Sequence, residues 1–560
     1  MLSFRSFSPF VLALSIVLPL ISHAFITKTA YWPEFLEEGG GSSQCVDTSS
    51  SCADYAFNYI THNSVKPSGE KLRLIKKYPA YTFDQLSTHF ADHPPMGFNK
   101  TFKQRYWVED QYYKPGGPVF FLDGGETTGM DRLVYLETGI VKYLAEATNG
   151  LGIIFEHRYY GRSHVAKDLS TESLQLLTTA EALADNAYFS SNFPYSAHRG
   201  LDSSILSNST PWIIYGGSYA GAKSAFSRYL YPDQIWGAIA SSGVVTAIEN
   251  FWEYTEPIRK HAAPTCVEAI KNVVAALDDA IFRAGTNELG QYKKSVEVIT
   301  LMKLFGLEEL SNVQDWMTTI AYMHSAWQDR NWDMSLEGTS DWDWFCSNLT
   351  AGAEKEEAYQ FHSPRLVGGQ EILSNLQDTG KGGDIIDQQV KNFGSFIKRE
   401  FVDPCTSHGL DVETCFGSEN MKWYNDTSLN QGLRRPWLYQ VCTEWGYFQA
   451  ETPPGYPALY SRTHNLAYAS KFCNRAYGFD GDRDPWLYAT THSPISPLKS
   501  RGEHLKYGDG ILIQEGYHHV DENGLGDVRL EPERIRKVHE REVEVVRGWV
   551  KEWEESKKKN

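Results

Sequence analysis

The sequence has no apolar run of the roughly 20 residues that a transmembrane helix needs. It also has no Cys-x-x-Cys pair, no cysteine and histidine spacing typical of a zinc site, and no long low-complexity tract. Basic side chains are the minority, with 53 Lys and Arg against 70 Asp and Glu and a formal net charge of -17. We therefore expect a folded protein without membrane anchor, metal or other cofactor, for which nucleic acid is a poor partner.

The first 24 residues nevertheless have the pattern of a secretory signal peptide. A basic residue comes early at Arg5, an apolar stretch runs from Phe10 to Ile21, and Ser22-His23-Ala24 matches a small-x-small cleavage site. The apolar stretch is too short for a membrane span. The pattern thus predicts export.

Export bears on the eight cysteines, because an oxidising compartment favours disulfides. Cys45 and Cys52, and likewise Cys405 and Cys415, are close enough in sequence for local loops, but the sequence does not fix the pairing. Export also makes N-glycosylation plausible at four Asn-x-Ser/Thr sequons. These begin at Asn99, Asn208, Asn348 and Asn425.

At 560 residues the chain exceeds one core of ordinary size, so two domains, or one domain with a large insertion, fit its length. Strand-like runs occur in the first half, helical patterns dominate from about Ile248 to Arg435, and strand signals then return. The expected parts are a signal peptide (1–24), an N-terminal extension (25–80), the first part of an α/β domain (81–247), a helical cap insertion (248–435) and the second part with a C-terminal helix (436–560).

Short apolar runs that end in glycine or in polar turns predict buried strands leading into loops. Helical patterns lie between or after them, at 178–193, 266–284, 386–401 and 531–553. Such alternation predicts a parallel sheet covered by helices on both faces, an α/β fold. The strand-like runs are 118–126, 151–161, 211–218 and 235–245 in the first part, and 436–449, 473–486 and 510–521 in the second.

The run "WIIYGGSYAGAK" (212–223) contains a candidate nucleophile, Ser218. Gly216 precedes it by two residues, and Ala220 and Gly221 follow it. A serine on a sharp strand-to-helix turn needs small neighbours, because larger side chains would collide there. Alanine replaces the last glycine of the common Gly-x-Ser-x-Gly pattern, a small steric departure. Packing of a strand on a helix would explain the turn equally well, so partner residues must decide.

A serine hydroxyl is a weak nucleophile, so a histidine must accept its proton and an acid must orient that histidine. In α/β-hydrolases these residues follow the serine in the order acid, then histidine, each on a loop after a strand. The late runs "FDGDRDPW" and "GYHHVD" offer Asp480, Asp482 or Asp484, and then His518 or His519. Spacing leaves the choice open, and a hydrated turn with a surface histidine pair is the non-catalytic alternative.

Acyl transfer also needs hydrogen-bond donors for the oxyanion, since the loss of one donor costs about 10²- to 10³-fold in rate. The backbone N–H of Tyr219, directly after the candidate nucleophile, is the first candidate. The loop Gly124-Gly125-Glu126 after an earlier strand is the expected source of the second, with Gly125 as the predicted donor. An ordinary strand-ending turn would have the same sequence.

Eight segments of the sequence follow one another in this order: "FDQLSTHF", "TFKQRYWVEDQYYKPGGPVFFLDGGE", "EHRYYGRS", "LTTAEALAD", "GGSYAGA", "QVCTEWGYFQ", "DRDPW" and "GYHHVD". As an ordered set they resemble the S28 family of serine peptidases, which includes Pro-X carboxypeptidases, dipeptidyl peptidases and fungal prolyl endopeptidases. The resemblance runs from about Phe83 to His519 and is weaker in the expected cap.

The resemblance implies an α/β-hydrolase fold with an inserted helical cap, and peptide hydrolysis after proline or a small residue near a chain end. It selects Asp484, the acid before Pro-Trp, and His518 as the catalytic partners of Ser218. Trp486 would line a proline pocket, although core packing explains it equally well, and His519 would lie beside the substrate. An apolar aromatic pocket suits a proline ring, which has no N–H to satisfy.

One departure from the family pattern bears on the substrate. Members that act as carboxypeptidases tend to carry an arginine shortly after the histidines, where it can meet a substrate carboxylate. Here Glu522 and Asn523 stand at that place. An amino-terminal exopeptidase would instead need a carboxylate for the substrate ammonium. Glu126, Glu156 and Glu444 lie in family-like segments, and Glu126 is taken as the substrate-binding candidate.

The sequence thus predicts a secreted or lysosomal/vacuolar serine peptidase that acts on peptides, with a homodimer left open. An esterase or lipase on the same scaffold is the enzymatic alternative, and a non-catalytic hydrolase-like binding protein is the other. The expected cap is rich in charge and tryptophan rather than in long apolar helices, and all three triad candidates are present. Both observations favour the peptidase, whose endo- or exopeptidic mode the sequence does not decide.

Overall fold

The computed structural model describes the backbone of residues 11–13 and residues 69–198, 201, 205–334, 338–352, 382–407, 409–419, 421–429, 434–477 and 520–559. A seven-stranded sheet has the order β1-β7-β6-β4-β5-β3-β2. Neighbouring strands are parallel from β1 to β5, whereas β3 is antiparallel to both β5 and β2. The strands are β1 (Val11–Ala13), β2 (Tyr81–Leu86), β3 (Thr101–Glu109), β4 (Val119–Asp123), β5 (Leu151–Phe155), β6 (Trp212–Gly217) and β7 (Gly237–Ser241).

The four strands β4 to β7 confirm the four apolar runs predicted in the first part of the chain. Nearly every residue in them is buried, as expected where helices cover both faces of a parallel sheet. The antiparallel strands β2 and β3 were not predicted from periodicity. They include exposed polar positions, so their sequences are less continuously apolar.

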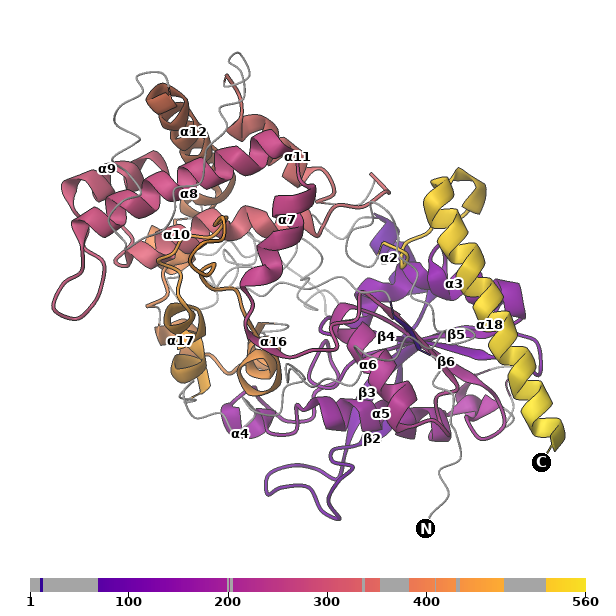
Figure 1. The fold of residues 1–560 in the computed structure, drawn as a ribbon. Coiled ribbons are helices and arrows are strands. Elements are labelled where there is room, and N and C mark those ends of the chain that lie inside the picture. Colours follow the sequence, from indigo (N-terminus) through magenta and orange to yellow (C-terminus); the bar gives the residue numbers. More distant parts are fainter. Residues whose placement is uncertain are drawn as a thin grey trace, which may run out of the picture.

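Helices lie on both faces of the sheet. Successive strand residues point to opposite sides, so Phe120 and Leu122 pack with α3 (Ile140–Thr148) and the C-terminal helix α18 (Glu533–Lys559). Phe121 packs on the other side with α5 (Thr179–Asn192). Figure 1 shows α18 running beside α3, where Val545, Val546 and Trp549 of the predicted apolar stripe are buried.

Regular structure is present before Tyr81, the expected start of the domain. Helix α2 (Gly69–Lys77) lies within the segment expected to be an extension. Leu74 and Tyr78 are buried in the same core as α3, and the Tyr78 hydroxyl donates to Glu109 Oε2 at 2.8 Å. Two apolar contacts in a largely basic helix give little sequence signal, which explains why the pattern missed it.

Helices are the only regular elements described between β8 (Ile248–Asn250) and β9 (Gly446–Phe448), which pair with each other. They form a region beside the sheet with a hydrophobic core of its own (Figure 1). The longer helices there and nearby are α7 (Glu256–His261), α8 (Pro264–Ala284), α9 (Val296–Leu304), α10 (Val313–Ala321), α11 (Asp341–Leu349), α12 (Gly382–Ile397), α16 (Arg434–Gln440) and, after β9, α17 (Leu466–Tyr477).

The strand predicted at 436–449 is wrong for most of its length. The chain is helical in α16 and continues as a π-helical turn to Trp445, and only β9 is a strand. The buried side chains Leu438, Val441 and Trp445 have helical spacing. A short apolar run does not distinguish a buried strand from a buried helix, which is why this error arose.

Three disulfides join parts of the described chain. Cys405 and Cys415, which the sequence placed close enough for a local loop without fixing the pairing, are bonded to each other. Cys266–Cys346 joins α8 to α11, and Cys442–Cys473 joins α17 to the turn after α16. Cys45 and Cys52 lie outside the described residues.

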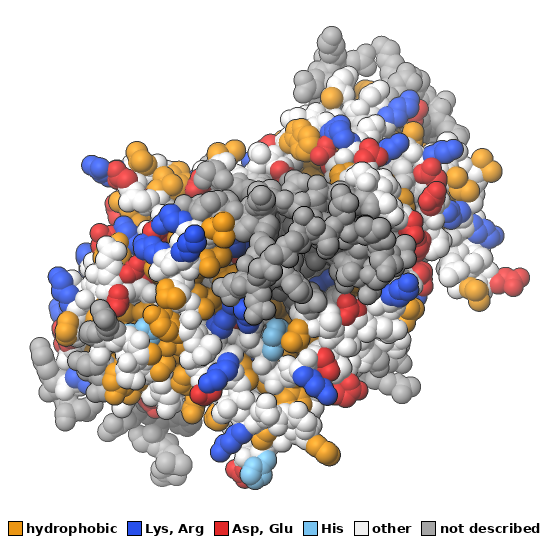
Figure 2. Space-filling view, turned by 180° about the vertical axis from the view of Figure 1, so that it is seen from behind, with side chains coloured by type: hydrophobic (Ala, Val, Ile, Leu, Met, Phe, Trp, Pro, Cys, Tyr) orange, Lys and Arg blue, Asp and Glu red, His pale blue; other side chains and the backbone are white. Residues whose placement is uncertain are grey.

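The surface carries the many charged side chains that the composition indicates. Acidic and basic side chains are interspersed on the face drawn in Figure 2. Among the residues that the structure describes, no helix combines the length and the apolar character needed to cross a bilayer. At the predicted glycosylation sites, Asn99, Asn208 and Asn425 are exposed, whereas Asn348 is half-buried and donates to Trp344 O at 2.8 Å.

Candidate active site

The candidate nucleophile Ser218 sits at the junction between β6 and α6 (Ser218–Leu230). Its φ of 61° lies in the left-handed region, which is uncommon for a residue with a side chain and marks local strain. A Cβ on Gly216 would lie 2.2 Å from Ala220 O, and a Cβ on Gly221 would lie 2.6 Å from Ser241 O. Backbone contacts therefore impose the small neighbours that the sequence pattern indicated.

The Ser218 hydroxyl is buried, with 5% of the residue exposed. Among the described residues, its Oγ has no hydrogen-bond partner. A buried hydroxyl of this kind calls for an explanation, and a nucleophile whose base comes from another segment is one. The predicted partners Asp484 and His518, and the substrate-binding candidates Trp486 and His519, lie outside the described residues.

The chain shortly after His518 is anchored to β6, the strand that leads into Ser218. Asp521 is fully buried, and its Oδ2 accepts a hydrogen bond from the hydroxyl of Tyr215, at 2.9 Å. Tyr215 lies three residues before Ser218. The Ser241 hydroxyl at the end of β7 donates to Asp521 Oδ1. Sequence analysis missed Asp521, although it directly follows the "GYHHV" run.

The loop after β4 lies against the first turn of α6. A Cβ on Gly125 would be 3.3 Å from Ala220 Cβ, and the φ of Gly125 is 67°, a conformation that favours glycine. The N–H of Gly125, our predicted second oxyanion donor, donates to Asp123 Oδ1 at 3.0 Å. As an oxyanion donor it would have to share its hydrogen with this carboxylate.

Arg132 connects this loop to the segment that follows the histidines. Its Nε donates to Gly124 O at 3.3 Å, and its Nη1 lies 4.0 Å from Glu522 Oε2. Glu522 stands where carboxypeptidases of the family tend to carry an arginine, and it is only 2% exposed. Its carboxylate therefore belongs to an internal contact. No local pattern marks Arg132 in the sequence.

Two of the three glutamates considered for a substrate ammonium are used inside the fold. Glu156 is fully buried and accepts from Arg105 Nε and Nη2 at 2.9 and 2.7 Å. Glu444 accepts from the backbone N–H and hydroxyl of Thr179, and burial raises its pKa to about 7. Glu126 is half-buried at the loop after β4 and stays a prediction.

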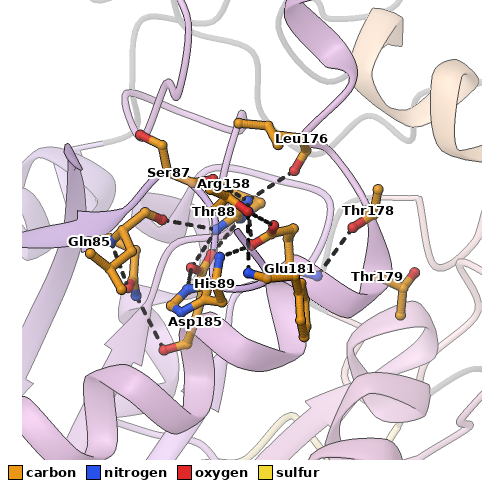
Figure 3. A network of polar contacts seen from close by, with 12 residues as sticks. Gln85, Ser87, Thr88, His89, Arg158, Leu176, Thr178, Thr179, Glu181 and Asp185 are labelled. Carbon is orange, nitrogen blue, oxygen red and sulfur yellow. Dashed lines mark hydrogen bonds and ion pairs between the residues drawn. The ribbon is translucent and has the colours of Figure 1, made fainter. Parts of the chain in front are cut away.

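Figure 3 shows a network of polar contacts around Arg158, which is fully buried. Its guanidinium donates to both carboxylate oxygens of Asp185, at 2.7 and 2.6 Å. The ring nitrogen His89 Nε2 lies 2.8 Å from Asp185 Oδ1, and the backbone N–H of His89 donates to Glu181 Oε2 at 2.9 Å. This network joins three of the segments that carry the family resemblance, 83–90, 156–163 and 177–185, close to the end of β5.

The side chain of Tyr219 has a role that sequence analysis did not foresee. Its hydroxyl lies 3.0 Å from His157 Nε2 and accepts from Gln440 Nε2 at 2.8 Å. Burial raises its pKa well above the ordinary value. The phenol thus ties the start of α6 to α16, while the backbone N–H remains the candidate oxyanion donor.

In the described part of the chain, no cluster of His, Cys, Asp and Glu could hold a metal.

Comparisons with known proteins give the family. The family model of the serine carboxypeptidase S28 group matches residues 89–347. A probable extracellular serine carboxypeptidase of Arthroderma benhamiae is 34% identical over 509 residues, which cover 85% of this chain and 68% of that protein. The thymus-specific serine protease of Mus musculus is 34% identical over 397 residues, 70% of this chain and 69% of that protein. The lysosomal Pro-X carboxypeptidase of Bos taurus is 24% identical over 492 residues, 83% and 87% of the two chains. The chain therefore belongs to the serine carboxypeptidase S28 family and is a serine-type peptidase with an α/β-hydrolase fold.

Proposed function

We propose that this protein is a secreted or lysosomal/vacuolar peptidase that cleaves peptides after proline or a small residue, near a chain end, through a Ser-His-Asp mechanism. The observation that carries the proposal is the strained Ser218 with its buried hydroxyl at the strand-to-helix turn. Strain of this kind persists only where the surrounding structure enforces it, and it is concentrated at functional sites.

In this mechanism Ser218 Oγ attacks the carbonyl carbon of the scissile bond while His518 accepts the serine proton. His518 then gives that proton to the leaving amine, and Asp484 orients the imidazole throughout. Water, deprotonated by His518, next attacks the acyl-enzyme and releases Ser218. The Tyr219 N–H and the loop 124–126 stabilise the oxyanion. The anchor at Asp521 supports the assignment of His518, since His518 is three positions before Asp521 and three residues of extended chain span at most about 10 Å.

The expected substrate follows from the relatives and from residues of the candidate site. The names of two relatives, an extracellular serine carboxypeptidase and a lysosomal Pro-X carboxypeptidase, support export and a preference for proline. Trp486 would line the proline pocket and His519 would lie beside the substrate. Glu126, half-buried on the loop after β4, would meet the ammonium of a substrate amino terminus.

A peptide panel tests this function. Each peptide has proline or alanine at the second position from either end, with that end free or blocked, and a matched ester accompanies each amide. Mass spectrometry then gives the cleaved bond. We expect amide cleavage after proline that depends on one free end. Cleavage of the esters without any of the amides would contradict the proposal and favour an esterase.

A further inference from the structure

A buried ion pair lies directly beneath the candidate oxyanion loop. Asp123, the last residue of β4, is 3% exposed, and Lys223 on α6 is 1% exposed. Lys223 Nζ lies 2.7 Å from Asp123 Oδ2 and donates to Oδ1 at 3.0 Å. The same carboxylate accepts from Asn186 Nδ2 on α5 and from the N–H of Gly125, both at 3.0 Å. One carboxylate thus joins a strand, two helices and the loop.

Stability alone is a weak explanation for this pair. Removing two charges from water costs several kcal/mol per ion, about as much as their attraction returns, so apolar packing would serve the core at least as well. Burial lowers the pKa of Lys223, and the negative charges of Asp123, Asp185 and Glu126 oppose that shift. The pair is therefore costly to keep, which points to a role for the contacts it makes.

Lys223 is not placed to act as the base for Ser218. The two residues are five positions apart on α6, so their side chains leave the helix about 140° apart. Within the described part of the chain, Ser218 Oγ has no hydrogen-bond partner, Lys223 included. The ammonium of Lys223 is directed instead to Asp123, and through it to the loop.

The loop has little freedom to move without changing the geometry around Ser218. A Cβ added to Gly125 would lie only 3.3 Å from the Cβ of Ala220, the residue two positions after the nucleophile. The hydrogen bond from the Gly125 N–H to Asp123 fixes the first bend of the loop. Donors held in place before the reaction are what makes an oxyanion site effective, because they need not reorganise when charge develops.

We propose that Lys223 and Asp123 are positioning residues that hold the loop 124–126 against the first turn of α6, so that its backbone and the Tyr219 N–H can stabilise the same oxyanion. Lys223 is the ion-pair partner of the buried Asp123 carboxylate, and Asp123 holds the loop. The inference rests on the proposed function, since an oxyanion forms only if Ser218 attacks an acyl group.

The test uses the full-length chain with Lys223→Met, Asp123→Asn and the double variant. Two quantities are measured, the kinetics on a proline-containing peptide amide and the affinity for a peptide boronate. The tetrahedral serine adduct of a boronate places an oxygen in the oxyanion site. We expect kcat and boronate affinity to fall together by about 10- to 100-fold, with KM changed by less than about 2-fold. The double variant should lose no more kcat and boronate affinity than the more impaired single variant, because both substitutions disrupt the same interaction.

A matched control is Asp278→Asn. Asp278 on α8 is also a buried carboxylate that accepts a backbone N–H, that of Arg462 at 2.8 Å, but it lies in the helical region. This variant should lose stability without losing kcat or boronate affinity. If the charged-pair variants fail to fold, Gly125→Ala serves instead, because its Cβ would press on Ala220 and displace the loop with the pair intact.

The outcomes separate this inference from the proposed function. Folded variants that keep kcat and boronate affinity within about 2-fold of a peptide-cleaving wild type would overturn the positioning role alone. A wild type that neither cleaves peptides nor reacts with a serine-directed fluorophosphonate would overturn the proposed function, and this inference with it.

Discussion

At the scale of single residues, the geometry of Ser218 depends on its glycine neighbours. Gly216 and Gly221 face backbone atoms so closely that no side chain fits at either position. The left-handed serine is thus enforced by packing of β6, α6 and the end of β7. The strain belongs to the turn as a whole, and the turn should respond to a single added methyl group.

Gly216→Ala is expected to destabilise the protein by about 1–3 kcal/mol and to abolish peptide hydrolysis. The reason is that the new Cβ would lie 2.2 Å from Ala220 O and push the helix away from the strand. Denaturant unfolding and hydrolysis of a peptide amide check the two effects. Gly526→Ala is the control, since its Cβ would meet nothing within 4 Å. Equal stability and activity of the two variants would contradict this account of the turn.

Glu444 gives a prediction about pH. Burial raises its pKa to about 7 from an ordinary value of 4.5. The folded state therefore binds a proton more tightly than the unfolded state. This contribution to stability is complete below about pH 4.5 and is lost as pH rises through 7. Glu444→Gln cannot ionise, so it should gain up to about 3 kcal/mol relative to wild type between pH 4.5 and pH 8.

Urea unfolding of wild type and Glu444→Gln at pH 4.5 and pH 8 measures that difference. Glu146→Gln, a change of an exposed glutamate on α3, should alter stability little at either pH. The same stability difference between wild type and Glu444→Gln at both pH values would show that the carboxyl of Glu444 is not held protonated by burial.

At the scale of elements, the hydrophobic pattern of the sequence predicts secondary structure correctly in the central sheet and in the helix α5 that covers it. The runs at 118–126 and 211–218 are strands buried on both faces, and the pattern at 178–193 is α5 within a residue at each end. It fails where tertiary contacts decide, as at 436–449, where a buried helix was read as a strand. Helix α2 was missed because its stability comes from a few contacts with distant segments.

The disulfides of the helical region allow a quantitative comparison. Cys266–Cys346 closes a loop of 80 residues, and Cys405–Cys415 closes one of 10. In the chain-entropy description the longer loop stabilises more, because the unfolded chain loses more freedom. Replacing both cysteines of the longer bridge by serine should cost about 2 kcal/mol more than replacing those of the shorter one. Calorimetry under identical conditions checks this, and a reversed order would contradict it.

At the scale of the whole molecule, the site is assembled from segments far apart in the sequence. Ser218 could be predicted as a candidate from its turn, because that signal is local, whereas the choice of Asp484 and His518 came from the resemblance to the S28 family and stays a prediction. Asp521, Arg132 and Lys223 could not be predicted, since their importance arises only when the segment after the histidines, the loop after β4 and α6 come together. Local sequence indicates the chemical groups, whereas the fold supplies the residues that hold them.

The central claim is that Ser218 is the nucleophile of a peptidase. The most direct measurement compares wild type with Ser218→Ala by peptide hydrolysis and by fluorophosphonate labelling followed by peptide mapping. The account predicts a label on Ser218 in the wild type, no label in the variant, and a loss of hydrolysis of about 10⁶-fold. A Ser218→Ala protein that still hydrolyses the peptide, or a wild-type label on another serine, would contradict it.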